Sequence, residues 1–336
     1  MTFDRAVIAS MNMPYAIEAL GPGLAPDVAC ATEDHGPVIR IIAPYRESSL
    51  LAAGPGGCMS LAVDPANPRD LYAVMGCFLG YRFQGAAIYR LRDGGEPERI
   101  VPLPFAHRIG FARKGGRRVL LAASLAADKR EASDWSQPGA VYALDAAGLE
   151  PGAVLEQVLP GLHKNHGFLL TALEGRRSLL IGASEGLLAI DLEDPGPRWP
   201  VRTLLQREVS EVALLDLDGD GVPELVTIEP FHGNAVRAYR KSTAGWDVFW
   251  EAELEFGHSL VASAFQGHRC VLVSSRAGRK ELLLFAFEDD LVHPRRYIVE
   301  EGAGAANLVV VTDGQRDLIL AANQGTSEIV LYSPRE

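Results

Sequence analysis

The sequence has few cysteines and no long apolar segment. Its four cysteines include no CxxC pair, which favours free thiols in a reducing compartment over a disulfide framework or a zinc knuckle. No apolar run is long enough to cross a bilayer, and the first twenty residues lack a basic segment followed by an apolar one. We therefore expect a cytoplasmic protein.

Positive charge is also in the minority. Asp and Glu number 43 against 32 Lys and Arg, so the net charge is -11. This charge repels phosphate backbones and anionic membrane surfaces, and we expect neither nucleic acid nor membrane as a partner. P-loop and dinucleotide fingerprints are absent from the sequence, which leaves nucleotide and nicotinamide chemistry without support.

The sequence does contain an internal repeat. Its unit is a short apolar strand, a tight turn, a second apolar strand that ends in small residues, a loop and a third strand. The spacing between successive copies ranges from 43 to 59 residues, which is typical of β-propeller blades. The seven copies begin at Tyr15, Cys58, His107, His166, Glu211, His258 and Ala305.

A fourth strand precedes the later repeats, for example at residues 98–104 and 153–160. The last repeat has none, because the chain ends shortly after residues 327–333. Residues 3–11 have the same strand character, and we expect them to pair with residues 327–333 and close the ring without a free sheet edge. The prediction is all-β: one domain over residues 1–336, a seven-bladed β-propeller of four-stranded blades. A two-sheet sandwich is the alternative, which the regular spacing disfavours.

The up-and-down order of a blade predicts which residues share a face of the disc. The loop after the second strand returns to the face where the first strand began, so the repeat starts and these loops surround one mouth of the central channel. Two of the eight histidines, His268 and His293, belong to the other face. The remaining six are predicted at this mouth: His35, His107, His163, His166, His232 and His258.

Four of the repeat starts form a candidate metal site, because His107, His166, Glu211 and His258 come from consecutive blades and can converge near the axis. Imidazole with carboxylate is a ligand set for zinc, manganese or iron. We therefore predict a divalent metal ion at the channel mouth. The alternative is that these histidines hydrogen-bond to neighbouring backbone in a wet channel.

A second candidate site lies in the turn that contains Asp216, Asp218 and Asp220. Alternating carboxylates with glycines at the bends are typical of calcium loops. A single copy can equally be a polar turn whose aspartates accept hydrogen bonds from their own backbone, and this alternative is favoured over calcium. The turn is predicted on the face opposite the histidines.

Residues 216–226, DLDGDGVPELV, resemble the FG-GAP or VCBS propeller repeat of integrin α-chain heads and many bacterial propellers. The strict motif covers one blade, and the looser repeat covers the whole chain. Blades that open with a histidine directed into the channel resemble those of aldos-2-ulose dehydratase and related keto-sugar lyases. The sequence departs from that family in having no room for its appended cupin domains.

The resemblance implies metal-assisted elimination on a small carbohydrate that already carries a ketone. A metal ion polarises the keto oxygen while a histidine removes the neighbouring proton; we assign His232 as the base and His163 as a second acid or base. The alternatives are a non-catalytic propeller that binds carbohydrate or protein, and a metal-dependent sugar lactonase. The predicted sugar contacts are Tyr15, Glu33, His35, Trp135, Lys164, Asn165 and Asn234.

Overall fold

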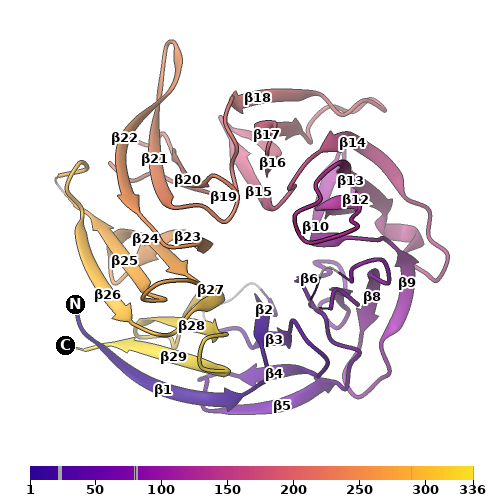
Figure 1. Cartoon of the computed structure of the whole chain (residues 1–336), viewed down its shortest axis with the longest axis horizontal. Coiled ribbons are helices and arrows are strands. Elements are labelled where there is room, and N and C mark those ends of the chain that lie inside the picture. The colour runs from indigo at the N-terminus through magenta and orange to yellow at the C-terminus, as the bar shows by residue number, and fades with distance from the viewer. Residues whose placement is uncertain (22–24, 79, 81, 289, 336) are drawn as a thin grey trace.

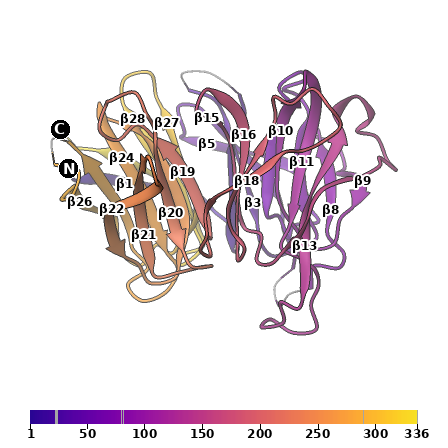
Figure 2. The same ribbon diagram turned by 90° about the horizontal axis from the view of Figure 1, so that it is seen from above.

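A computed structural model of the chain describes residues 1–21, 25–78, 80, 82–288 and 290–335. Seven antiparallel sheets are arranged around a central axis (Figure 1), and the edge-on view shows their strands crossing the thickness of the disc (Figure 2). Over these residues the only helix is a single 3-10 turn, Ala146–Gly148, and none is long and apolar enough to span a bilayer. The predicted seven-bladed β-propeller is confirmed.

The first three blades follow one another along the chain. The third has an additional short strand, β12 (Ala126–Asp128), which pairs with β13. Their strands are β2 (Pro14–Ala19), β3 (Val28–Thr32), β4 (Val38–Ile42) and β5 (Glu47–Ala52); β6 (Ser60–Val63), β7 (Leu71–Met75), β8 (Ala87–Leu91) and β9 (Glu98–Pro102); and β10 (Ala106–Lys114), β11 (Arg117–Ser124), β13 (Gln137–Asp145) and β14 (Glu156–Leu162).

The next three blades repeat this order. Each inner strand begins within one residue of the predicted repeat start. Their strands are β15 (Gly167–Leu173), β16 (Arg176–Ala183), β17 (Gly186–Asp191) and β18 (Val201–Leu205); β19 (Glu211–Leu215), β20 (Glu224–Glu229), β21 (Ala235–Ser242) and β22 (Gly245–Glu253); and β23 (Gly257–Phe265), β24 (His268–Ser275), β25 (Leu282–Phe287) and β26 (Arg295–Glu300).

The seventh blade is built from both ends of the chain. It contains β27 (Ala305–Thr312), β28 (Asp317–Asn323) and β29 (Glu328–Pro334), and β1 (Phe3–Ser10) is its outermost strand. β1 runs antiparallel to β29, from Phe3 opposite Pro334 to Ser10 opposite Glu328, and the two termini lie close together in Figure 1. The predicted closure is confirmed, and it pairs β29 along its whole length.

The core lies between neighbouring blades. The second strand of a blade is covered on both faces, so it is an almost continuous apolar run, as in the buried segment Val119–Ser124 of β11. Leu320 and Ile329 of the seventh blade pack in one cluster with Ile17 and Val28 of the first. The four cysteines are buried free thiols, as the sequence predicts.

The entry into several blades uses the same strained turn. Met13, Phe105, Lys164 and Phe256 have φ values of 47°, 56°, 51° and 60°, a left-handed conformation that costs a side-chain-bearing residue about 1–2 kcal/mol. Each stands two residues before the side chain that enters the mouth. Hydrogen bonds join these turns to the loops after the second strands: Glu33 N to Met13 O (2.8 Å), Leu125 N to Phe105 O (2.9 Å) and Arg276 N to Phe256 O (2.9 Å).

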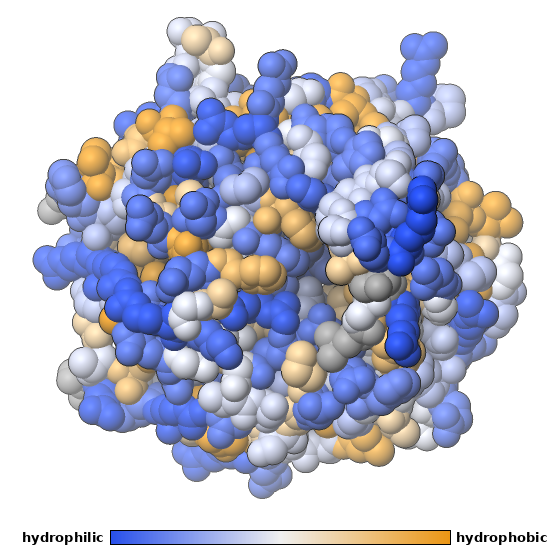
Figure 3. Space-filling view, in the orientation of Figure 1, coloured by the Kyte–Doolittle hydropathy of each residue, from blue (hydrophilic) through white to orange (hydrophobic). Residues whose placement is uncertain are grey.

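A β-bulge lies near the start of the inner strand in four blades, and in three of them it follows the strained turn. Tyr15, His107, His258 and Ala306 are each the extra residue where the pairing of the first two strands shifts register. A bulge bends its strand and re-aims the side chain of the extra residue. It therefore presents these residues at the channel mouth instead of between blades. On the face seen in Figure 3 the disc is hollowed near its centre.

Candidate functional site

Five ring side chains meet where the bulges open onto the channel. Tyr15 Oη lies 3.3 Å from His107 Nε2 and 3.2 Å from His258 Nε2, and His232 Nε2 lies 3.3 Å from His166 Nε2. The five residues come from five different blades. We refer to Tyr15, His107, His166, His232 and His258 as the histidine cluster.

Three members of the cluster have the geometry of metal ligands. His166, His232 and His258 each place a ring nitrogen within 4.8 Å of the other two. His258 Nδ1 lies 2.7 Å from the carbonyl oxygen of Ala306, and His166 Nδ1 lies 2.7 Å from Glu211 Oε1. Because these oxygens accept, each Nδ1 carries the proton and each Nε2 keeps its lone pair. Metal-binding histidines are commonly oriented in this way.

Glu211, a predicted ligand, lies behind the histidines. Its Oε1 accepts a hydrogen bond from Arg108 Nη2 at 2.6 Å in addition to its contact with His166. Burial opposes ionisation, but the guanidinium of Arg108 and the ring of His166 hold the pKa of Glu211 below its usual value. The structure therefore gives this carboxylate the position of a charged group that orients His166.

His107, another predicted ligand, lies beside the group of three. Its ring centre is 4.4 Å from that of His166, and its buried Nδ1 has no hydrogen-bond partner among the described residues. Burial lowers the pKa of His107, His232 and His258 well below the usual histidine value. These rings are therefore neutral at pH 7, the state that binds a metal ion.

Tyr15 links two of these histidines. Since His258 Nε2 accepts, Tyr15 donates its hydroxyl proton to it and accepts from His107 Nε2. Burial raises the pKa of Tyr15 far above its usual value, so the phenol keeps its proton. A metal ion at His258 Nε2 would take the place of this hydrogen bond.

The predicted acid–base histidines lie in different surroundings. His232 belongs to the group of three, with its ring stacked on Phe231 at a centre distance of 4.0 Å and tilted against Phe256 at 4.6 Å. His163 lies further out, where its Nδ1 is 2.6 Å from Glu185 Oε1 and its side chain is 38% exposed. Of these two histidines, His163 is therefore the one that combines a carboxylate partner with access to solvent.

Three predicted sugar contacts, which lie in or near the fourth blade, contact other protein groups. Lys164 Nζ pairs with Glu208 at 2.9 Å, and Lys129 Nζ lies 3.4 Å from the centre of the Trp135 ring. The buried Asn165 donates through Nδ2 to backbone carbonyls of the third blade at 3.3 Å, so it joins two blades. Lys164 and Trp135 stay partly exposed.

The remaining predicted contacts lie around the first and fifth blades. Glu33 Oε2 lies 3.5 Å from Arg276 Nη2, and the Arg276 guanidinium is 5.8 Å from the Tyr15 ring centre. His35 stacks on Phe78 at 4.0 Å, and Asn234 is exposed. Glu33 is therefore linked to the histidine cluster through Arg276.

Sequence reasoning missed Arg108, Phe231 and Phe256. Arg108 directly follows a mouth histidine, and Phe231 directly precedes His232. Proximity in sequence to the predicted histidines was therefore a usable signal for two of them. Phe256 occupies the strained turn two residues before His258, a position that no residue pattern marks.

The acidic turn lies at the opposite end of β20 from His232. Asp216, Asp218 and Glu224 place three carboxylate oxygens within 4.8 Å of one another. The Asp216 carboxylate also accepts from Gly219 N at 2.6 Å, and Asp220 accepts from Val222 N at 2.7 Å. These bonds are those of a self-capped polar turn, and the three converging oxygens are equally compatible with the calcium alternative.

We expect Asp218→Ala to lower the free energy of unfolding by about 1 kcal/mol. The substitution removes the acceptor of Asp220 N–H and the 2.8 Å ion pair with Arg240. Asp218→Asn, which keeps an acceptor oxygen, should cost less. Denaturant unfolding measures both. Loss of ligand binding at the histidine cluster in a folded Asp218→Ala protein would contradict the assignment of faces.

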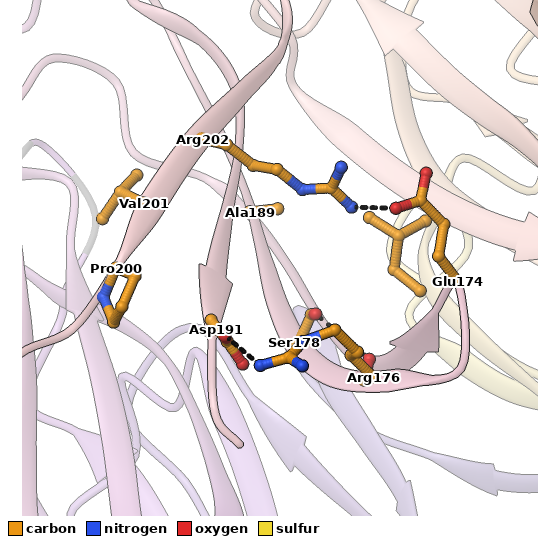
Figure 4. A pocket seen from close by; sticks show the side chains of 9 residues that line it. Glu174, Arg176, Ser178, Ala189, Asp191, Pro200, Val201 and Arg202 are labelled. Carbon is orange, nitrogen blue, oxygen red and sulfur yellow. Dashed lines mark hydrogen bonds and ion pairs between the residues drawn. The ribbon is translucent and has the colours of Figure 1, made fainter. Parts of the chain in front are cut away.

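A pocket of about 290 Å³ in the fourth blade is a weaker candidate site. Its charged side chains are paired within the blade, Arg202 with Glu174 at 2.7 Å and Arg176 with Asp191 at 2.6 Å (Figure 4). Glu174 also pairs with Lys241 of the next blade. The charges that line this pocket are thus neutralised by one another.

Neither a protein-family model nor a curated protein matches the chain. Solved β-propellers do. The Cps50 (Swd1) β-propeller domain of Myceliophteria thermophila is similar at a TM-score of 0.63 and 16% identity, over 98% of this chain and 99% of that one. A gluconolactonase of Xanthomonas campestris is similar at a TM-score of 0.54 and 11% identity, over 98% of this chain and 89% of that one. YCF48 of Cyanidioschyzon merolae is similar at a TM-score of 0.59 and 11% identity, over the whole of both chains. Similarity at this identity shows the fold alone.

Proposed function

We propose that His166, His232 and His258 bind one divalent transition-metal ion and that the mouth around it is the active site for a small carbohydrate. The observation that carries the proposal is the convergence of three ring nitrogens within 4.8 Å, with Glu211 and the carbonyl of Ala306 fixing the tautomer of two rings. Three histidines with an open fourth position are a donor set of catalytic zinc.

The reaction we propose is elimination on a keto sugar. A bound metal ion would polarise the keto oxygen. His163 is our choice for the base, because the Glu185 contact leaves its Nε2 free to accept a proton. It takes the proton from the carbon next to the ketone, and the leaving group departs from the following carbon with its electron pair. The resemblance to keto-sugar lyases supports this reaction.

Hydrolysis of a sugar lactone is the second candidate. The same three-histidine set suits activation of a water molecule. The gluconolactonase of Xanthomonas campestris shares the propeller fold, so a lactone-opening site is compatible with this architecture. Lactone hydrolysis removes no proton from carbon, which is the role that we assign to His163 in elimination. A His163→Ala variant that retained full turnover would therefore favour lactone hydrolysis over elimination.

Elemental analysis of protein purified without chelator or added metal tests the metal site. We expect about one zinc, manganese or iron ion per chain, and turnover of a member of a panel of keto-glycosides and aldonolactones. Protein that contains no metal, and takes up neither zinc nor manganese at neutral pH, would refute the proposal. Stoichiometric metal with saturable sugar binding but no turnover would instead indicate a non-catalytic carbohydrate-binding propeller.

A further inference from the structure

A cavity of about 340 Å³ occupies the channel behind the histidine cluster. It is lined by the residues that follow the mouth positions along the inner strands, so it lies on the side of the cluster away from the mouth. None of the five ring residues of the cluster lines it. Twelve of the 17 residues that line it are apolar, and its polar side chains are Glu18, Ser60, Arg108, Glu211 and Asn307.

The two carboxylates in this cavity differ in their surroundings. Glu211 is neutralised by Arg108, whose Nη2 lies 2.6 Å from its Oε1. Glu18 is only partly exposed, and it makes no hydrogen bond or ion pair within the described part of the chain. Burial raises the pKa of Glu18 to about 7. The cavity therefore contains one carboxylate whose charge no protein group compensates.

The surroundings of Glu18 are apolar and come from several blades. Leu169, Val261 and Val309 stand at the equivalent position of three other inner strands and line the same cavity. No other carboxylate joins Glu18 in a group that could hold a metal ion within the described residues. The chemistry of this end is thus one anionic group in an apolar wall, and a cavity of this volume is large enough for a small ligand.

We propose that the channel cavity binds a small organic amine, with its ammonium group paired to Glu18 and its alkyl part against the apolar wall. A partly buried carboxylate without a partner is unfavourable, and an ammonium ion supplies both the missing charge and N–H donors. The apolar side chains exclude water from the alkyl part. This site is separate from the metal site that we propose at the mouth.

Titration with n-butylammonium chloride at pH 8.5 tests the proposal by calorimetry or ligand-observed NMR. At this pH the Glu18 carboxyl, with its pKa of about 7, is mostly ionised. We expect saturable binding of one molecule per chain. Glu18→Gln, which keeps the size of the side chain and removes its charge, should weaken this binding by about tenfold or more. Butan-1-ol should bind at least tenfold more weakly than the amine.

The matched control is Glu47→Gln, at an exposed glutamate of β5 on the rim of the disc, which should bind the amine as the unsubstituted protein does. Metal content and melting temperature show that Glu18→Gln is folded and that the mouth site is intact. Equal affinity of Glu18→Gln and the unsubstituted protein, or no saturable binding to the unsubstituted protein, would overturn the proposal. Neither result affects the metal site, whose failure is detected by elemental analysis.

Discussion

Deletion of residues 1–10 is expected to lower the melting temperature by about 10 °C or more. The deletion removes β1, which has seven residue pairs with β29, and each lost hydrogen bond costs roughly 1 kcal/mol. One kcal/mol corresponds to about 2–4 °C in a domain of 150–250 residues. The exposed edge of β29 is also free to pair with another chain, so we expect aggregation during thermal unfolding.

Arg5→Ala is the control for this deletion. Arg5 pairs with Glu300 and Glu328 on the surface, and exposed ion pairs contribute about 0–1 kcal/mol. The variant keeps the strand, so its melting temperature should fall by only a few degrees. If the truncated protein melted at the temperature of the full chain, β1 would not be what closes the ring.

His166→Ala is expected to reduce the affinity for zinc or manganese by about a hundredfold or more and to abolish turnover with it. The substitution removes one of the three converging nitrogens and leaves Glu211 with Arg108 alone. Since His166 is buried, the variant also loses some packing. Glu211→Gln avoids this loss of volume. It weakens the acceptor of His166 Nδ1 and removes the charge that pairs with Arg108, and affinity should fall about 10- to 100-fold.

His268→Ala is the control for the metal site. His268 begins β24 at the opposite face, and its side chain is 42% exposed near Glu288. Metal content and turnover of this variant should equal those of the unsubstituted protein. A folded His166→Ala protein that binds zinc with unchanged affinity would exclude His166 as a ligand, and the cluster would then be better explained as a hydrogen-bond network.

The fold was predictable because each blade carries its own signal. The alternation of short apolar strands with tight turns is local, and it located the starts of the inner strands to within two residues. The closure followed from counting, because the last blade lacked one strand and residues 3–11 had no other partner. Neither step required knowledge of contacts between blades.

The candidate site was less predictable because its geometry depends on contacts between blades. The ring of His232 packs against Phe256 of the next blade. His232 lies in a loop outside the repeat, so its contacts could not be inferred from a repeat position. Glu211 occupies a repeat start, but Arg108 from another blade engages its carboxylate. The sequence therefore predicted which face carries the histidines. The structure was needed to show which three of them bring ring nitrogens together, and which residues contact those three.

The bulges near the blade starts have the same backbone path whichever side chain they carry. At one such position the chain carries phenol, at two imidazole, and at Ala306 only a methyl group, yet the register shift is the same. The carbonyl of Ala306 accepts the hydrogen bond of His258 Nδ1, and its methyl group is fully buried. The same register shift thus accommodates a phenol, an imidazole or a methyl group, so the backbone path at these positions does not depend on the side chain that it carries.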